Sequence, residues 1–309
     1  MRPAAPLPPA LAGLPLTAAL LRRHRVPTRR LRRDDMTPLG SGVFLLRHTA
    51  DGLDPRERLR MRALGVTADH SDSWASHTTV AQLLRLPLPR RVEMDLHIST
   101  PRDTAPVRRE GVRPHRVTVH PGELRTVGQL PVSSAEQMFL ECATVLRVDE
   151  LIALGDALVR RPRPHYETRR SPYSSIEALA ASLDAHRNVH GHPVASAALN
   201  QVRVGADSAP ETRMRLALIR AGLPEPELQV PADPQNPRSP QADAAYVRQK
   251  LALQYDGRVH FDVDRAKQDR RVDRHFSSRG WTVLRYYDED AREGFRRTTL
   301  EVRRALEAR

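Results

Sequence analysis

The chain of 309 residues contains little cysteine, little lysine and few aromatic side chains, and it has no long apolar run. Its one cysteine, Cys142, excludes a disulfide scaffold and a four-cysteine zinc site. No apolar run approaches the roughly 18 residues that a membrane-spanning helix needs. The proline-broken start lacks the order of charged and apolar residues found in a secretory signal. We therefore expect a cytoplasmic protein that makes no contact with a membrane.

Arginine supplies nearly all the positive charge, because Lys250 and Lys267 are the only lysines. Lysine and arginine together number 50 against 37 acidic residues, which gives a formal net charge of +13. A GC-rich genome also favours arginine, so this composition alone gives modest support to a polyanionic partner. Hydrophobic residues make up 39% of the chain, enough to bury cores and to exclude disorder along its whole length.

The length predicts two or three domains. We expect an α/β (α+β) protein with a winged-helix-like DNA-binding segment over residues 1–50, a small α/β domain over residues 51–205 and a third domain over residues 206–309. The proline- and arginine-rich residues 161–175 predict a loop or linker within this order.

The N-terminal segment over residues 17–46 has the order helix, turn, helix and hairpin. Thr17 is suited to cap the first helix, residues 28–35 predict the second, and residues 40–42 predict the tip of the hairpin. As a recognition helix, the second would face phosphates with four arginines, which are Arg29, Arg30, Arg32 and Arg33. The alternative is a solvated basic helix on an unrelated surface.

The middle region alternates stretches that are typical of helices and strands. Asp54 predicts the start of a helix, and residues 92–100 alternate like a half-buried strand. Residues 132–161 predict a long amphipathic helical stretch, and Ser133 and Glu136 fit a capping box at its start. The region therefore predicts a small domain of helices and strands.

Histidines are frequent in the middle region but are not spaced as metal ligands. No two form a helical pair four residues apart among His70, His77, His97, His115 and His120. In residues 190–192 a solvated loop is favoured over a metal site. Cys142 lies among apolar residues of the helical stretch, so we expect a buried and inert thiol.

The last hundred or so residues have the most regular pattern, in the order helix, three strands, helix, strand and helix. A proline-rich segment over residues 231–241 predicts a wide hairpin loop between the first two strands. The expected strands cover residues 228–230, 242–246, 250–255 and 281–286.

Acidic side chains gather in these C-terminal elements. A metal-dependent phosphodiesterase needs two or three carboxylate oxygens around one divalent cation, which binds a phosphate oxygen and a water. Asp243 on the second strand and Asp256 at the end of the third are placed for this, and Glu211 on the preceding helix adds a carboxylate. Residues 254 and 256 share a face because side chains alternate along a strand.

The spacing of these residues resembles the PD-(D/E)XK nuclease superfamily, in particular its very-short-patch-repair-endonuclease-like branch. In that branch a helix with a glutamate precedes the motifs D-x-x-[YF], E-x-D-G-x-x-H, D-x-x-R and G-W-x-V-L-R. The corresponding residues here are Glu211, Asp243 to Tyr246, Gln254 to His260, Asp269-Arg-Arg and Gly280 to Arg285. The resemblance covers residues 206–309 and implies a restriction-endonuclease-like core, with a mixed sheet flanked by helices. It also implies DNA cleavage that depends on Mg²⁺ or Mn²⁺.

The sequence departs from this branch at Gln254, where a glutamate is expected. The neutral carbonyl oxygen of an amide binds a hard cation far less well than a carboxylate. The lysine of the superfamily is replaced by Asp256, and Lys250 and Lys267 have no motif support. Carried over to this sequence, the resemblance makes Asp243, Asp256 and Glu211 metal ligands, Gln254 a weak ligand and His260 an assisting group.

The N-terminal and middle regions resemble the antitoxins of type IV (abortive-infection) toxin–antitoxin systems. The resemblance rests on Gly42-Val43-Phe44 within residues 16–47, and on residues 76–89 and 130–143. It implies that this protein binds DNA and has a cognate toxin or another protein as a partner.

Each candidate residue also has a structural alternative. Glu211 follows Ser208 at capping-box spacing, Asp256 and Gly257 are a common turn pair, and His260 then lies in a loop. A basic helical stripe either faces solvent or holds a nucleic-acid backbone, and it consists of Arg270, Arg271 and Arg274.

Two functions therefore remain open. The first is a metal-dependent DNA endonuclease with a DNA-binding front segment. The second is an antitoxin-like transcriptional repressor whose nuclease-fold domain has lost its chemistry. Gln254 is the residue that discriminates between them, and no stacking aromatic pair points to RNA instead of DNA.

Overall fold

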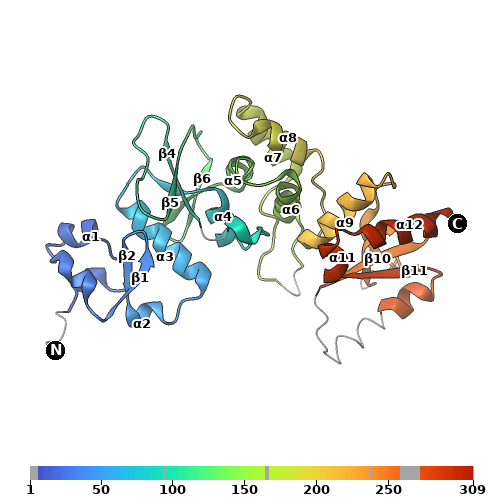
Figure 1. Cartoon of the computed structure of the whole chain (residues 1–309), viewed down its shortest axis with the longest axis horizontal. Coiled ribbons are helices and arrows are strands. Elements are labelled where there is room, and N and C mark those ends of the chain that lie inside the picture. Colours follow the sequence, from blue (N-terminus) through green and yellow to red (C-terminus); the bar gives the residue numbers. More distant parts are fainter. Residues whose placement is uncertain (1–5, 93–94, 164–166, 237–238, 258–271, 309) are drawn as a thin grey trace. The chain divides into compact units, whose positions relative to one another are not determined.

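The computed structural model describes residues 6–92, 95–163, 167–236, 239–257 and 272–308. The chain is a mixed α/β protein, as predicted, and forms two compact units (Figure 1). The first unit comprises residues 1–146 and 181–192, and the second comprises residues 147–180 and 193–309. The N-terminal segment over residues 1–50 thus belongs to the same unit as residues 51–146. The three domains predicted from the sequence, with limits at residues 50 and 205, stay a prediction.

The first unit holds the helices α1 (Ala18–Arg23), α2 (Arg47–Ala50), α3 (Pro55–Ala68), α4 (His77–Leu83) and α5 (Ala135–Cys142). Its strands are β1 (Met36–Gly40), β2 (Val43–Leu46), β3 (Trp74–Ala75), β4 (Leu96–Pro101), β5 (Val112–Val117), β6 (Leu124–Val127) and β7 (Leu130–Ser133). The short 3-10 helices are η1 (Pro9–Leu11), η2 (Thr28–Arg32) and η3 (Arg90–Val92).

The second unit holds the helices α6 (Val148–Val159), α9 (Ala209–Arg220), α11 (Asp288–Arg292) and α12 (Arg296–Glu307). Its strands are β8 (Glu227–Pro231), β9 (Gln241–Tyr246), β10 (Leu251–Asp256) and β11 (Thr282–Tyr287), and residues 272–277 are helical. The chain passes between the units within α7 (Ile176–Ala185) and α8 (His192–Leu199). None of the described helices combines the length and the apolar character needed to span a bilayer.

The N-terminal segment contains the predicted hairpin but not the predicted recognition helix. Thr17 caps α1 by accepting a hydrogen bond from the backbone of Leu20 at 3.1 Å, and β1 pairs with β2 across a tip at residues 40–42. All three tip residues have positive φ, which suits the glycines on either side of Ser41. The second helix is only the five-residue η2, because Arg33 is extended and β1 begins at Met36.

The first unit is built on a five-stranded sheet in the order β5-β4-β3-β7-β6. The pairs β4–β5 and β3–β7 are parallel, and the pairs β3–β4 and β6–β7 are antiparallel. Two predictions for residues 132–161 are corrected. The cap of α5 is Ser134, which accepts from the backbone of Gln137, because Ser133 still belongs to β7. The long helical stretch splits into α5 and α6, with a turn over residues 143–147.

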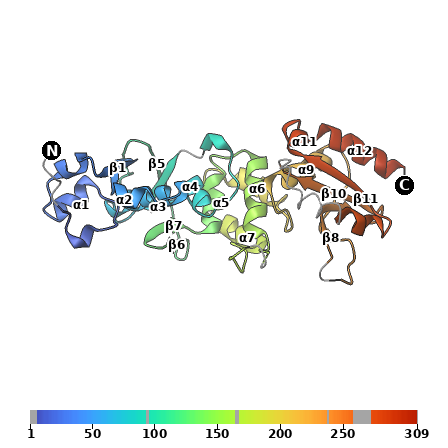
Figure 2. The same ribbon diagram turned by 90° about the horizontal axis from the view of Figure 1, so that it is seen from below.

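The second unit is built on a four-stranded mixed sheet in the order β11-β10-β9-β8, whose strands lie within one residue of their predicted ends. Only the β10–β11 pair is parallel. Alternation of side chains places Leu253 and Tyr246 on the face covered by α9 and α12, and places Ala252 against Phe276 on the other face. Figure 2 shows α11 and α12 on one side of the strands β10 and β11. Helices therefore cover both faces of the sheet.

Candidate functional site

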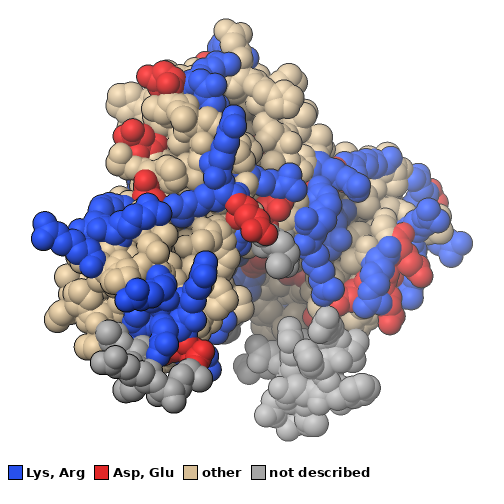
Figure 3. Space-filling model, turned by 60° about the vertical axis from the view of Figure 1, so that its left-hand side comes forward, with Lys and Arg blue, Asp and Glu red and all other residues tan. Residues whose placement is uncertain are grey.

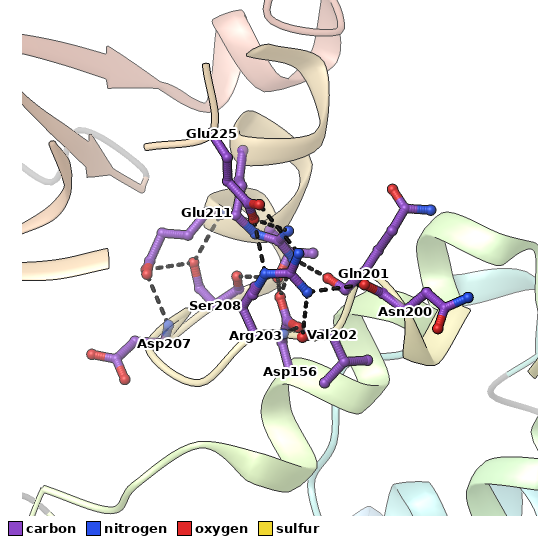
Figure 4. Close-up of polar contacts among 11 residues, drawn as sticks. Asp156, Asn200, Gln201, Val202, Arg203, Asp207, Ser208, Glu211 and Glu225 are labelled. Carbon is purple, nitrogen blue, oxygen red and sulfur yellow. Dashed lines mark hydrogen bonds and ion pairs between the residues drawn. The ribbon is translucent and has the colours of Figure 1, made fainter. Parts of the chain in front are cut away.

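Glu211 lies in the first turn of α9, where the structure gives it two hydrogen bonds (Figure 4). The Ser208 hydroxyl donates to one carboxylate oxygen at 2.8 Å, and the Asp207 backbone N–H donates to the other at 2.8 Å. Ser208 also caps the helix by accepting from the Glu211 backbone N–H at 3.4 Å. The predicted capping box is present only in this half, because the Glu211 carboxylate accepts from the backbone of Asp207 rather than that of Ser208. Glu211 is only 7% exposed, and no basic side chain contacts its carboxyl group within the described residues.

Asp243 lies in β9, one residue beyond the last residues that pair with β10. The Tyr255 backbone N–H donates to its carboxylate at 2.7 Å, where the ladder would otherwise continue. Burial raises the pKa of Asp243, the Tyr255 hydrogen bond opposes this, and the charge of Asp256 raises it further. Burial also raises the pKa of Glu211, and the charge of Asp243 adds to the effect. The two carboxylates from α9 and β9 therefore repel each other across the end of the sheet.

Asp256 does not complete a close cluster with these two carboxylates. It forms an ion pair with Arg285 of β11, which also binds Asp273 at 2.8 Å. Within the described residues, no three carboxylates bring ligand oxygens within 4.8 Å of one another. The charge of Asp243 acts on Glu211 and the charge of Asp256 acts on Asp243, while Arg285 pairs with Asp256. That the three carboxylates hold one metal ion stays a prediction.

The amide of Gln254 is engaged by the backbone of the neighbouring strand. Its nitrogen donates to the carbonyl oxygen of Gln241 at 3.0 Å, and the side chain is 8% exposed. Lys250 is at the opposite end of β10 from Asp256 and donates to the carbonyl of Arg279, so it does not replace the missing lysine. Arg274 lies on the exposed side of the helix over residues 272–277. The predicted residues His260 and Arg270 lie outside the described residues, as does Lys267.

A buried ion pair fixes the helix that carries Glu211 (Figure 4). Arg215 of α9 is 1% exposed and donates to Asp156 of α6 at 3.0 Å. Asp156 also accepts from the Thr212 hydroxyl at 2.8 Å and from the Arg203 backbone at 2.7 Å. Arg215 binds Glu225 through its other nitrogen at 3.1 Å. Nothing in the local sequence pattern distinguishes Arg215 from the exposed arginines of the same helix.

The four arginines of the N-terminal segment do not share one role. Arg30 is 8% exposed, and its two terminal nitrogens donate to both carboxylate oxygens of Asp35 at 2.7 and 2.6 Å. Arg30 is therefore corrected from a phosphate contact to a buried partner of Asp35. Arg29 and Arg32 are exposed, and Arg33 is half-buried.

Three histidines of the middle region meet although their sequence spacing gave no such signal. His77 follows β3, His97 lies in β4 and His115 lies in β5, so only the pairing of these strands brings the rings together. Among the residues that the structure describes, they are the one group of three or more metal-ligating side chains whose ligand atoms all lie within 4.8 Å.

Comparison of the chain with protein-family models, with curated proteins and with solved structures finds no match. The resemblances to nucleases and antitoxins therefore rest on the sequence motifs alone.

Proposed function

We propose that the protein binds DNA and that its second unit is a divalent-metal-dependent phosphodiesterase with a weakened site. The observation that carries this proposal is the buried pair Glu211 and Asp243, whose like charges raise each other's free energy at the end of a mixed sheet. Buried carboxylates with raised pKa values are typical of sites that work on a charged ligand. A divalent cation removes the repulsion that the pair otherwise imposes on the fold.

The donor set fits Mg²⁺ or Mn²⁺, which take oxygen ligands and are commonly held by one or two carboxylates together with substrate phosphates. Glu211 and Asp243 would hold such an ion, which when bound polarises a phosphate oxygen and an attacking water. Ser208 and the Tyr255 backbone orient the two carboxylates through the hydrogen bonds described above. Lysine and arginine side chains form several basic patches on the face drawn in Figure 3, in keeping with a phosphate backbone as partner.

The test is cleavage of supercoiled plasmid with Mg²⁺ or Mn²⁺ by the wild type and by Asp243→Asn. Asparagine keeps an oxygen that accepts from Tyr255, so the fold is retained while the ligand charge is removed. We expect the variant to lose at least about 100-fold in rate, the scale on which one charged or polar group acts in an active site.

Glu227→Ala is the matched control, because Glu227 is an exposed carboxylate at the start of β8 in the same sheet. This control should cleave like the wild type. Equal cleavage by Asp243→Asn and the wild type would contradict the proposed site.

The repressor alternative is favoured by the contacts that Asp256 and Gln254 make within the fold. Arg285 neutralises Asp256, and Gln254 uses its amide to bind the backbone of Gln241, so two of the motif positions serve the fold. If the wild type binds DNA but cleaves none with either metal and binds no Mg²⁺, the DNA-binding repressor becomes the function.

The DNA-binding part of the proposal predicts a salt effect for Arg29 and Arg32. Log affinity falls with log salt concentration by about 0.9 for each phosphate that a cationic side chain neutralises. Replacing both exposed arginines by alanine should therefore lower the slope by about 1.8, measured with a short DNA duplex over a range of salt. Replacement of both by lysine keeps the charge and should keep the slope. An unchanged slope in the alanine variant would mean that Arg29 and Arg32 do not contact the DNA phosphates.

A further inference from the structure

The histidine cluster of the first unit is assembled by strand pairing. The antiparallel β3–β4 pair aligns Ala75 with Ile98, which brings His77, at the start of α4, beside His97. The parallel β4–β5 pair aligns Ser99 with His115, two residues along the same face from His97. His97 and His115 thus lie on two adjacent strands of one sheet, and His77 lies two residues after the end of the neighbouring strand β3.

The ring nitrogens are spaced like those of a metal site. His97 Nδ1 lies 2.8 Å from His115 Nε2, and one nitrogen of each ring lies within 4.8 Å of the other two. Zinc–nitrogen bonds of about 2.0–2.1 Å in a tetrahedron place ligand nitrogens about 3.3 Å apart, so the 2.8 Å contact between His97 and His115 would open by about half an ångström when an ion binds. The ring centroids of His77 and His115 lie 3.7 Å apart in a stacked arrangement. The χ2 angle of histidine is soft, so rotation about it would let the ring nitrogens turn toward one ion.

The three imidazoles are largely shielded from water. His77 and His97 are 3% and 1% exposed, and His115 is half-buried. Neutral imidazoles suit borderline ions such as Zn²⁺ or Co²⁺ and are poor ligands for Mg²⁺.

Supporting groups hold His77 in place, as they do for the histidine ligands of metal sites. Its Nδ1 lies 2.9 Å from the Ser76 hydroxyl and 3.7 Å from a carboxylate oxygen of Glu141. The same Glu141 oxygen accepts the backbone N–H of His77 at 2.9 Å, and the other oxygen accepts from Ser133 at 3.0 Å. These bonds hold His77 at a φ of +51°, a strained value for a residue with a side chain.

A cavity of about 290 Å³ gives access to the cluster from one side. His77, His115 and Glu141 line it together with Gln137, Arg102 and His186. A site with three histidine ligands needs such space, because its fourth position is filled by water or by a ligand. Entry for an ion and for a further ligand is therefore available on the side of His77 and His115.

We propose that His77, His97 and His115 bind one divalent transition-metal ion of the zinc class, with its remaining coordination position open to the cavity beside Glu141. This proposal is independent of the oxygen-ligand site in the second unit, because the two sites share no residue and differ in donor chemistry.

The test is titration of tag-free, chelator-treated protein with Co²⁺ and Zn²⁺, followed by visible absorption for Co²⁺ and by calorimetry for Zn²⁺. We expect one equivalent of either ion to bind to the wild type. His115→Gln removes a ligand at a half-buried position in β5, so the fold should tolerate it. This variant should bind more weakly by over about 100-fold, beyond the loss caused by removing only a supporting hydrogen bond.

Two controls separate this site from other effects. His48→Gln changes an exposed histidine of α2 and should leave binding unchanged. Zn²⁺ should also raise the Tm of the wild type but not that of His115→Gln, since an ion stabilises the state that binds it. Absence of binding to the wild type, or equal affinity in a folded His115→Gln, overturns the proposal.

Discussion

Arg215→Ala should destabilise the second unit by about 3–5 kcal/mol, the usual result of leaving one buried charge without its partner. Arg215 is 1% exposed and binds Asp156, Glu225 and the carbonyl of Gln201, so its loss removes one partner from each of three groups. Asp156 is also 1% exposed on its side chain, so it lies out of contact with bulk solvent. Burial already raises the pKa of Asp156 against the effect of Arg215, so removal of Arg215 should favour its protonation.

Urea unfolding followed by the fluorescence of Trp281 measures this effect. The chain has two tryptophans, one in each unit, so a Trp74→Phe background restricts the signal to the second unit. Arg213→Ala is the matched control, because Arg213 is an exposed arginine on the same helix and should change stability by less than about 0.5 kcal/mol. Equal effects of the two substitutions would show that the buried pair does not hold α6 to α9.

Gln254→Glu should have opposite effects on stability with and without a divalent cation. Without metal, glutamate adds a negative charge near Asp243 and loses the hydrogen bond to the Gln241 carbonyl, which should cost about 1–3 kcal/mol. With Mg²⁺, the third carboxylate completes the set that the nuclease-like motif requires. We expect at least about tenfold tighter Mg²⁺ binding, an added stabilisation of about 1.4 kcal/mol by the metal, and faster plasmid cleavage.

Calorimetry with Mg²⁺ and thermal unfolding in EDTA and in Mg²⁺ check this prediction. Gln235→Glu adds the same charge at an exposed position of the loop between β8 and β9, so it should change neither quantity. Failure of Gln254→Glu to bind Mg²⁺ would mean that Glu211 and Asp243 are not metal ligands. The second unit would then be a binding module rather than a weakened enzyme.

Local patterns predicted the elements of the second unit well. Alternation of apolar residues and the prolines of the 231–241 loop predict the strand limits. The helix caps are likewise predicted from the local sequence, and Ser208 and Thr17 cap their helices in the structure. Such signals are short-range, since a cap or a turn involves residues within a few positions of each other. The Ser133 prediction failed by one residue because β7 extends to Ser133 and leaves Ser134 as the cap.

The pairing of distant side chains could not be predicted in the same way. Asp256 was expected to face a metal, but its nearest charge is Arg285, which follows 29 residues later on the adjacent strand. The burial of Arg30 depends on how the N-terminal segment folds onto its core, not on its neighbours in the sequence. The histidine cluster likewise depends on the order and register of β3, β4 and β5, which no spacing rule for a single helix or loop detects.

The Asp156–Arg215 pair also has a consequence for how this chain could have been assembled in evolution. The nuclease-like motifs begin at Glu211, yet the counter-charge of Arg215 lies 59 residues earlier, on α6. A recombination event that cut the gene just ahead of the motifs would deliver a piece with an orphaned guanidinium in its interior. Transfer of these residues to another gene therefore requires that α6 travel with them, or that an apolar residue replace Arg215 in the same step.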